Sequence, residues 1–128
     1  MIKVLAIDDQ FDNLAIIQMS LQLEGIQVIT SDNGREGIEK AVAETPDVIL
    51  LDLMMPHMDG YEVYQQLKRK KVTKNIPVIM LTAVDQPQQM EKAKKMGMED
   101  YITKPFDPLN LATRIRFFLD KANKPTDQ

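Results

Sequence analysis

The sequence contains no cysteine and no tryptophan, and its 128 residues include a single histidine. Without cysteine, the chain can form neither disulfides nor thiolate metal sites. Its apolar runs are too short to span a membrane, and Met1-Ile2-Lys3 leads directly into one of them rather than into a signal peptide. The net charge of −3 gives no reason to expect direct binding to nucleic acid. We therefore expect a cytoplasmic protein without membrane attachment.

The composition that remains is typical of one globular domain. Hydrophobic residues make up 44% of the chain and charged residues 27%, and the length is sufficient for a hydrophobic core. The residues from 123 to 128 are polar. We predict a single domain over residues 1–122, followed by a polar tail over 123–128.

The most informative stretch is an apolar run, Val48 to Leu51, that ends directly in Asp52. The run does not alternate with polar residues and is bounded by Pro46 and Pro56, so it predicts a strand buried on both faces. Asp52 then lies at the carboxyl end of a central strand, where open α/β sheets bind their ligands. The alternative interpretation is that Asp52 only caps the following turn.

The same reasoning predicts the other strands and helices. Apolar runs at 3–7, 26–30, 76–81 and 101–103 predict four more strands, the second of them near an edge. Gly25 ends the first helix, whereas Asp85 and Asp107 are expected to cap the fourth and fifth. Apolar residues at helical spacing mark five helices: Phe11, Leu14, Ile17 and Leu21; Ile38, Ala41 and Val42; Val63, Tyr64 and Leu67; Met90, Ala93 and Gly97; Leu111, Ala112, Ile115, Phe118 and Leu119.

Five strands alternating with five helices predict an α/β fold, a flavodoxin-like three-layer (βα)5 sandwich with a parallel sheet of order 2-1-3-4-5. In that order the first, third, fourth and fifth strands are neighbours, and their carboxyl ends meet at one edge of the sheet. The residues at those ends are Asp8 and Asp9, Asp52, Thr82, and Lys104.

Three carboxylates at one edge repel one another, and a divalent cation would remove that repulsion. Hard oxygen ligands without sulfur point to Mg²⁺, with Mn²⁺ possible, and we expect His57 at the surface rather than as a ligand. Thr82 and Lys104 suit a phosphoryl group, for which Asp52 would be the nucleophile. Taken singly, Thr82 could only finish a strand and Lys104 could be solvated. The basic run at 68–71 is more typical of a solvated helix end than of a binding patch.

Together these motifs resemble the receiver domain of two-component response regulators, chemotaxis response regulators among them. The resemblance implies that Asp8, Asp9, Asp52 and the Met54 carbonyl hold Mg²⁺. It also implies that Asp52 receives a phosphoryl group from a histidine of a sensor kinase or phosphotransfer protein, and that the Lys104–Pro105 bond is cis. The motifs are Asp8-Asp9, Leu50-Leu51-Asp52-Leu53-Met54-Met55-Pro56, Asp59-Gly60, Thr82-Ala83 and Lys104-Pro105-Phe106.

By the family pattern, Thr82 would move toward the phosphoryl group and Tyr101 would turn inward. The face of the fourth helix, fifth strand and fifth helix would then signal to a protein target, as a monomer or a weak phosphorylation-dependent dimer. Met54 and Val84 would flank the path of the hydrolytic water, and neither can orient it by hydrogen bonding. We therefore predict slow self-dephosphorylation, and no enzyme activity beyond the domain's own phosphorylation and dephosphorylation.

Two other functions use similar residues. Haloacid-dehalogenase-like phosphatases form an aspartyl phosphate with Mg²⁺ and a lysine, but they need an acid two residues after the nucleophile, where this chain has Met54. A receiver-like binding module that is never phosphorylated is the other alternative. Such a module usually lacks one of the acidic, threonine or lysine residues, and none is missing here.

Overall fold

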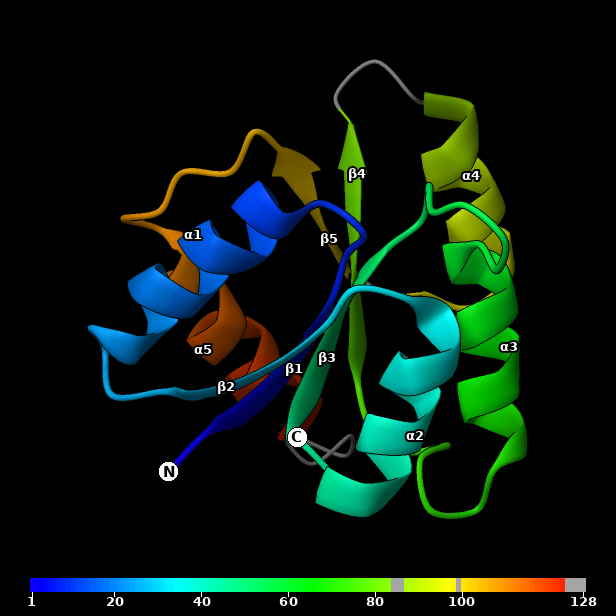
Figure 1. The fold of residues 1–128 in the computed structure, drawn as a ribbon, viewed down its shortest axis with the longest axis horizontal. Helices are drawn as coiled ribbons and strands as arrows, with labels where there is room; N and C mark the ends of the chain where they lie inside the picture. Colours follow the sequence, from blue (N-terminus) through cyan, green and yellow to red (C-terminus); the bar gives the residue numbers. More distant parts are fainter. Residues whose placement is uncertain (84–86, 99, 124–128) are drawn as a thin grey trace.

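The computed structural model describes residues 1–83, 87–98 and 100–123, which form a sheet covered by helices on both faces (Figure 1). Its five parallel strands run in the order β2-β1-β3-β4-β5. The predicted fold class and strand order are confirmed. The strands are β1 (Lys3–Ile7), β2 (Gln27–Ser31), β3 (Val48–Asp52), β4 (Val78–Ala83) and β5 (Asp100–Lys104).

The helices divide between the two faces of the sheet and create two hydrophobic layers. Helices α1 (Phe11–Gln22) and α5 (Leu111–Asn123) cover one face, and α2 (Gly34–Glu44), α3 (Gly60–Arg69) and α4 (Pro87–Lys95) cover the other. All five residues of β3 are buried, as expected of a central strand with helices on both sides. Strand β2 is an edge strand and only its last residue, Ser31, is buried.

The strand register brings four strand ends to one margin of the sheet. Ile7 of β1 pairs with Leu51 of β3. The residues that follow them in the chain, Asp8 and Asp52, are therefore neighbours. Asp52 pairs in turn with Leu81, and Ala83 pairs with Lys104. The side chains that carry the chemistry therefore start from neighbouring strands.

The structure corrects several details of the sequence prediction. Phe11 and Val42 were assigned to apolar helix faces, but they are 80% and 39% exposed. Phe11 is the first residue of α1, and helical periodicity does not reveal where the sheet beneath a helix ends. Gly97 lies beyond the end of α4 and has a φ of +103°. Helix α5 begins at Leu111, later than predicted from Asp107.

The late start of α5 has a local cause, because the Asp107 carboxylate accepts hydrogen bonds from the Leu109 N–H (3.0 Å) and the Asn110 side chain (2.9 Å). These bonds close a turn before the helix. Helix α5 continues to Asn123, one residue past the predicted domain end. The predicted cap Asp85 and the tail residues 124–128 lie outside the described residues. In the described ranges, no helix has the length and apolar character needed to cross a bilayer.

Candidate functional site

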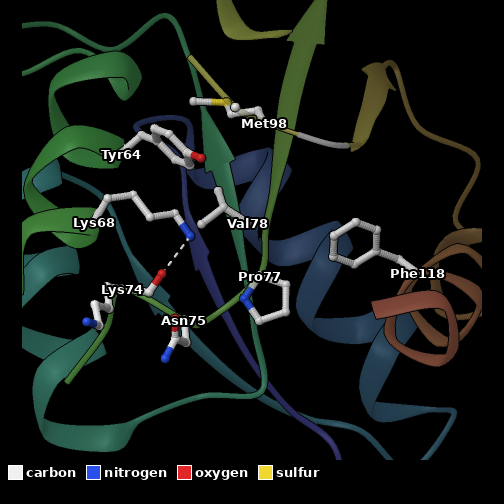
Figure 2. A pocket seen from close by; sticks show the side chains of 9 residues that line it. Tyr64, Lys68, Lys74, Asn75, Pro77, Val78, Met98 and Phe118 are labelled. Carbon is white, nitrogen blue, oxygen red and sulfur yellow. Dashed lines mark hydrogen bonds between the residues drawn. The ribbon is translucent and has the colours of Figure 1, made fainter. Parts of the chain in front are cut away.

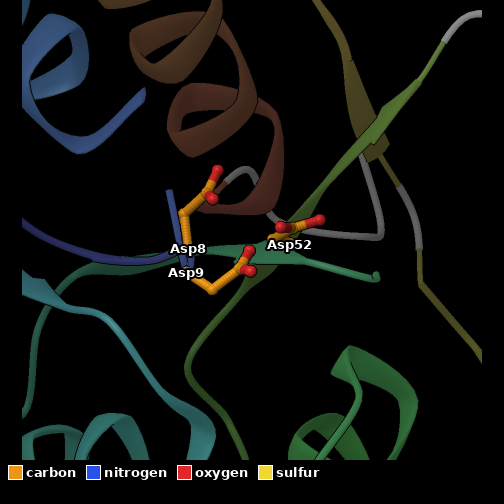
Figure 3. Close-up of side chains that lie close together, drawn as sticks. All are labelled: Asp8, Asp9 and Asp52. Atoms are coloured by element: carbon orange, nitrogen blue, oxygen red, sulfur yellow. The ribbon is translucent and has the colours of Figure 1, made fainter. Parts of the chain in front are cut away.

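Three carboxylates meet where β1 and β3 end (Figure 3). Asp8, Asp9 and Asp52 each offer a carboxylate oxygen, and these three oxygens lie within 4.8 Å of one another. Asp8 is fully buried and Asp52 is 4% exposed, whereas Asp9 is accessible to solvent. Sequence positions more than 40 residues apart are thus brought into one cluster by the parallel pairing of β1 with β3.

Lys104 reaches this cluster from β5, two strands away from β3 in the sheet. Its ammonium nitrogen lies 2.9 Å from Oδ2 of Asp8 and 3.2 Å from Oδ2 of Asp52. Lys104 ends β5, the edge strand opposite β2, and its peptide bond to Pro105 is cis. Thr82, which is 3% exposed, lies near the end of β4, the strand between β3 and β5. The predicted residues therefore surround one end of the central strand.

Hydrogen bonds from the flanking loops hold the two buried carboxylates in place. The backbone N–H of Gln10 donates to Oδ1 of Asp8 (2.9 Å), and the side-chain amide of Asn13 donates to Oδ2 of the same carboxylate (3.3 Å). The backbone N–H of Met54 donates to Oδ1 of Asp52 (3.0 Å). Sequence reasoning missed Gln10 and Asn13. Their polar residue types do not distinguish them in the sequence from other polar residues near a helix start.

The charges at the site are not balanced without a further cation. Burial raises the pKa of Asp52 from 3.8 to about 6, and the charge of Asp8 adds to this, while the Met54 N–H and Lys104 act in the opposite direction. Burial by itself would lower the pKa of Lys104, but the hydrogen bond and charge of Asp8 and the charge of Asp52 raise it. One ammonium, in contact with Asp8 and Asp52, thus shares the site with three carboxyl groups.

The donor set fits a hard divalent cation. Carboxylate oxygens grouped within 4.8 Å, without sulfur or histidine, are the ligands that Mg²⁺ prefers. One of the three carboxylates is open to solvent, so water can complete an octahedral shell. His57 is exposed, with a φ of +69°, and does not belong to the acidic cluster.

The first residue of α3, Gly60, packs directly against the backbone at the end of β3. The N–H of Gly60 donates to the Leu53 carbonyl (3.1 Å), and a Cβ atom at Gly60 would lie 2.6 Å from the Leu53 Cα. Only glycine permits this approach. The next residue, Tyr61, donates its hydroxyl to the Gln89 backbone carbonyl (3.0 Å), and the Lys92 ammonium lies 4.2 Å from its ring centroid. Helix α4 is therefore attached directly to the first turn of α3.

Two further predicted residues lie around this centre, and one is not described. Tyr101 is half-buried on β5, and its carbonyl accepts a hydrogen bond from Arg114 (2.9 Å). The Met54 side chain is 55% exposed beside Asp52. Val84 lies outside the described residues.

Comparison with known proteins identifies the family. The model of the response regulator receiver domain matches residues 4–116. The chain belongs to the response regulator receiver family. It is 38% identical over 120 residues to the alkaline phosphatase synthesis transcriptional regulatory protein PhoP of Bacillus subtilis, across 94% of this chain and 49% of that protein. It is also 38% identical over 122 residues to the DNA-binding dual master transcriptional regulator RpaA of Synechocystis, across 95% and 51%.

Solved receiver structures share the fold. The chemotaxis protein CheY4 of Vibrio cholerae has a TM-score of 0.85 and 33% identity, covering 91% of this chain and 98% of that one. A two-component response regulator of Clostridium difficile has a TM-score of 0.86 and 26% identity, covering 97% and 100%. The predicted likeness to chemotaxis response regulators is confirmed. As a receiver, the chain serves phosphorylation-activated two-component signalling. It spans about half the length of the curated relatives described above.

Proposed function

We propose that Asp52 is the residue that accepts the phosphoryl group, from a histidine of a sensor kinase or a phosphotransfer protein. The observation that carries this proposal is the position of the Asp52 carboxylate, buried at the end of β3 and 3.2 Å from the Lys104 ammonium. In the transfer, a carboxylate oxygen of Asp52 bonds to phosphorus. The bond from phosphorus to the donor nitrogen breaks, and its electron pair returns to the imidazole.

The neighbouring residues would stabilise the transferred group by charge and hydrogen bonding. Asp8, Asp9, Asp52 and the Met54 carbonyl would hold Mg²⁺, or Mn²⁺ in its place, which supplies positive charge to the phosphoryl oxygens. Lys104 would leave its present contact with Asp52 to bind one oxygen, and the Thr82 hydroxyl would donate to another. Asp8 keeps its hydrogen bonds from Gln10 and Asn13 throughout, which fixes its orientation.

Incubation with acetyl phosphate tests this proposal. The chain should gain one phosphoryl group in the presence of Mg²⁺ and none with EDTA, because the acidic cluster alone repels an anionic donor. Intact-mass spectrometry measures the gain. A chain that is phosphorylated equally well in EDTA would contradict the proposed role of the metal.

The phosphodonor protein would dock along α1. Apolar side chains on this helix and directly after it are exposed, although the rest of the domain buries most of its apolar residues: Phe11 at 80%, Met19 at 67% and Leu23 at 83%. Phe11 comes three residues after Asp8, so a helical partner lying on α1 would bring its histidine to the edge of the sheet where Asp52 lies.

Truncation of the Phe11 side chain tests whether it serves docking of the phosphodonor protein rather than the phosphoryl transfer itself. We expect Phe11→Ala to slow transfer from a phosphorylated histidine phosphotransfer domain by about tenfold, since exposed aromatic anchors dominate such contacts. Phosphorylation by acetyl phosphate should not change. Val72→Ala is the matched control, because Val72 is 55% exposed but lies at the opposite end of α3 from the site. Equal slowing with both donors would place Phe11 in the chemical step instead.

The response to phosphorylation would pass through Thr82 and Tyr101 to the α4–β5–α5 face, and from there to a protein target. Support comes from the small buried surface of α4, whose only fully buried side chain among the described residues is Ala93. Tyr101 is only half-buried and can move further inward. We propose that the domain acts as a monomer or weak phosphorylation-dependent dimer. Amide resonances of β5 and α4 should shift on phosphorylation more than those of α2.

The phosphorylated state should be long-lived. The Met54 side chain is exposed beside Asp52 and cannot position a water molecule by hydrogen bonding. We expect Met54→Asn to shorten the lifetime of the phosphorylated chain several-fold, measured as loss of the phosphoryl group by intact mass after the donor is removed. An unchanged lifetime would show that Met54 does not limit hydrolysis.

A further inference from the structure

Positive charge is concentrated on α3, on the loop that follows it and on α4. Residues 62–74 and 87–95 hold eight of the sixteen Lys and Arg residues but only two of the nineteen Asp and Glu, a net charge of +6. The rest of the chain carries −9. We call the basic end the exposed residues at the ends of the two helices: Arg69, Lys70, Lys71, Lys74, Lys94 and Lys95. Within the described ranges, only Lys95 of these pairs with a carboxylate, Glu91 at 3.8 Å.

The loop that carries half of these cations is held in a fixed shape. Thr73 is 1% exposed and donates its hydroxyl to the Leu67 carbonyl (2.6 Å). The Lys68 ammonium donates to the carbonyls of Lys74 (3.0 Å) and Ile76 (3.2 Å), and Figure 2 shows the first of these bonds. One lysine is therefore used to fix the backbone that presents the others.

A solvated helix end explains only part of this arrangement. The negative end of the α3 dipole favours cations in the last turn, such as Arg69. It does not account for Lys70, Lys71 and Lys74, which come after the helix and repel one another. An ordered loop that keeps like charges together is typical of a surface that meets an anionic partner.

A cavity of about 280 Å³ lies beside the loop after α3 and beside Gly97 and Met98, which follow α4 (Figure 2). Its apolar lining includes Tyr64, Pro77, Met98 and Phe118, and Lys74 and Asn75 also border it. Lys68 also lines it, so the cavity has polar as well as apolar walls, and its volume is sufficient for one side chain. The basic end thus offers cations beside a recess that has an apolar wall.

We propose that the basic end binds an acidic protein segment in which an apolar residue is flanked by Asp or Glu. Such a segment would place its apolar side chain in the cavity and its carboxylates against the surrounding cations. A nucleic-acid backbone has no group for the apolar recess. A long polyanion would also extend over the part of the domain that carries −9, and charges within about 10 Å would repel it. A short segment avoids this repulsion.

The proposed surface is separate from the phosphorylation site. The cavity lies beside Pro77, which precedes the first residue of β4, whereas Asp52 lies at the carboxyl end of β3. Parallel strands place these two positions at opposite ends of the sheet. A partner at the basic end would leave Asp52 accessible, and its binding does not require that Asp52 be the phosphoacceptor.

Fluorescence anisotropy with a short fluorescein-labelled peptide, one Phe flanked by Glu and Asp, tests the proposal. We expect saturable binding that weakens with added salt. Lys71→Glu should weaken binding about threefold or more, and Lys70→Glu with Lys71→Glu about tenfold or more. Arg35→Glu, at an exposed position of α2, makes the same change in net charge as Lys71→Glu and should have almost no effect. Replacing the peptide Phe with Ser should weaken binding about fivefold or more.

Other outcomes would overturn the proposal. These are no saturable binding, equal weakening by Lys71→Glu and Arg35→Glu, or a Ser-containing peptide that binds as well as the Phe-containing one. Tighter binding of a DNA duplex or of phosphatidylserine vesicles would assign the surface to a different class of partner. The Asp52→Asn chain should bind the peptide like the unmodified chain, so failure of this proposal and failure of the proposed phosphorylation are distinguishable.

Discussion

Asp52→Asn is expected to abolish phosphorylation by acetyl phosphate in the presence of Mg²⁺. The substitution preserves the shape of the side chain and its hydrogen bond from the Met54 N–H, which is 3.0 Å in the structure. It removes the anionic oxygen that would bond to phosphorus, and an amide is a very poor nucleophile. Intact-mass spectrometry should therefore find one added phosphoryl group on the unmodified chain and none on the variant.

Asp12→Asn is the matched control. Asp12 is an exposed acid in the first turn of α1, close in sequence to the acidic cluster but not part of it. This variant should be phosphorylated like the unmodified chain. If the Asp52→Asn chain gained a phosphoryl group to the same extent, the assignment of Asp52 would be wrong, and peptide mapping would identify the residue that carries it.

We expect the Asp52→Asn variant to be more stable than the unmodified chain in EDTA. Its loss of phosphorylation would then not be due to unfolding. The pKa of Asp52 is about 6 in the folded chain against 3.8 for the free group, chiefly because of burial. The folded state therefore binds this proton more tightly than the unfolded state, and the unmodified chain loses stability as the pH rises from about 4 to about 6. At pH 7 the Asn variant should be more stable by about 1–3 kcal/mol. Urea denaturation at several pH values measures this, and the difference should vanish below pH 4.

Lys104→Met should lower the stability of the domain strongly in the absence of Mg²⁺ and much less in its presence. Without metal, the variant leaves the buried carboxylates of Asp8 and Asp52 without their cation, which lies 2.9 and 3.2 Å away in the structure. Removing one partner of a buried ion pair costs about 3–5 kcal/mol, and because Lys104 is 20% exposed we expect about 2–4 kcal/mol in EDTA.

Mg²⁺ should restore most of this loss, because the metal would supply the missing positive charge. The Met variant also has no ammonium competing for the same oxygens, so Mg²⁺ should raise its Tm by more than it raises that of the unmodified chain. Thermal unfolding in EDTA and over a range of Mg²⁺ concentrations measures both effects. Lys121→Met, at an exposed position in the last turn of α5, should change Tm very little in either condition.

One result would contradict this account of Lys104. If Lys104→Met lowered the Tm equally in EDTA and in saturating Mg²⁺, the lysine would contribute packing rather than charge to the site. Phosphorylation of the variant should in any case be much slower, because the ammonium that would bind a phosphoryl oxygen is gone.

The elements of the sheet and the identity of its carboxyl-end residues could be read from the sequence because both depend on simple patterns. The run from Val48 to Leu51 is buried on both faces, and such runs end where the sheet ends. Once the strand order is known, Asp8 and Asp52 must be neighbours, since parallel strands begin and end together. The residues of the cluster thus follow from topology alone.

Other parts of the site could not be predicted because they depend on local backbone geometry. Asn13 contacts Asp8 because the loop after β1 turns back toward the end of that strand. No residue pattern in the sequence predicts this change of direction. The link from Tyr61 to Gln89 depends on the tilt of α4 relative to α3. Phe11 looked like a core residue because it fits the helical period, and its exposure depends on where the underlying sheet stops.

The burial of β3 has a consequence for how information leaves the domain. This strand has a hydrogen-bonded strand on each side and a helical layer on each face, so its amides should exchange with solvent only when the whole domain opens. The residue that we propose undergoes the chemical change therefore belongs to the part of the chain with the least freedom to rearrange. Displacement has to occur at the periphery, in β5, which has a neighbour on one side only, and in α4, which buries little apolar surface. The fold thus holds the proposed reaction site rigid in β3 and allows β5 and α4 to move in response.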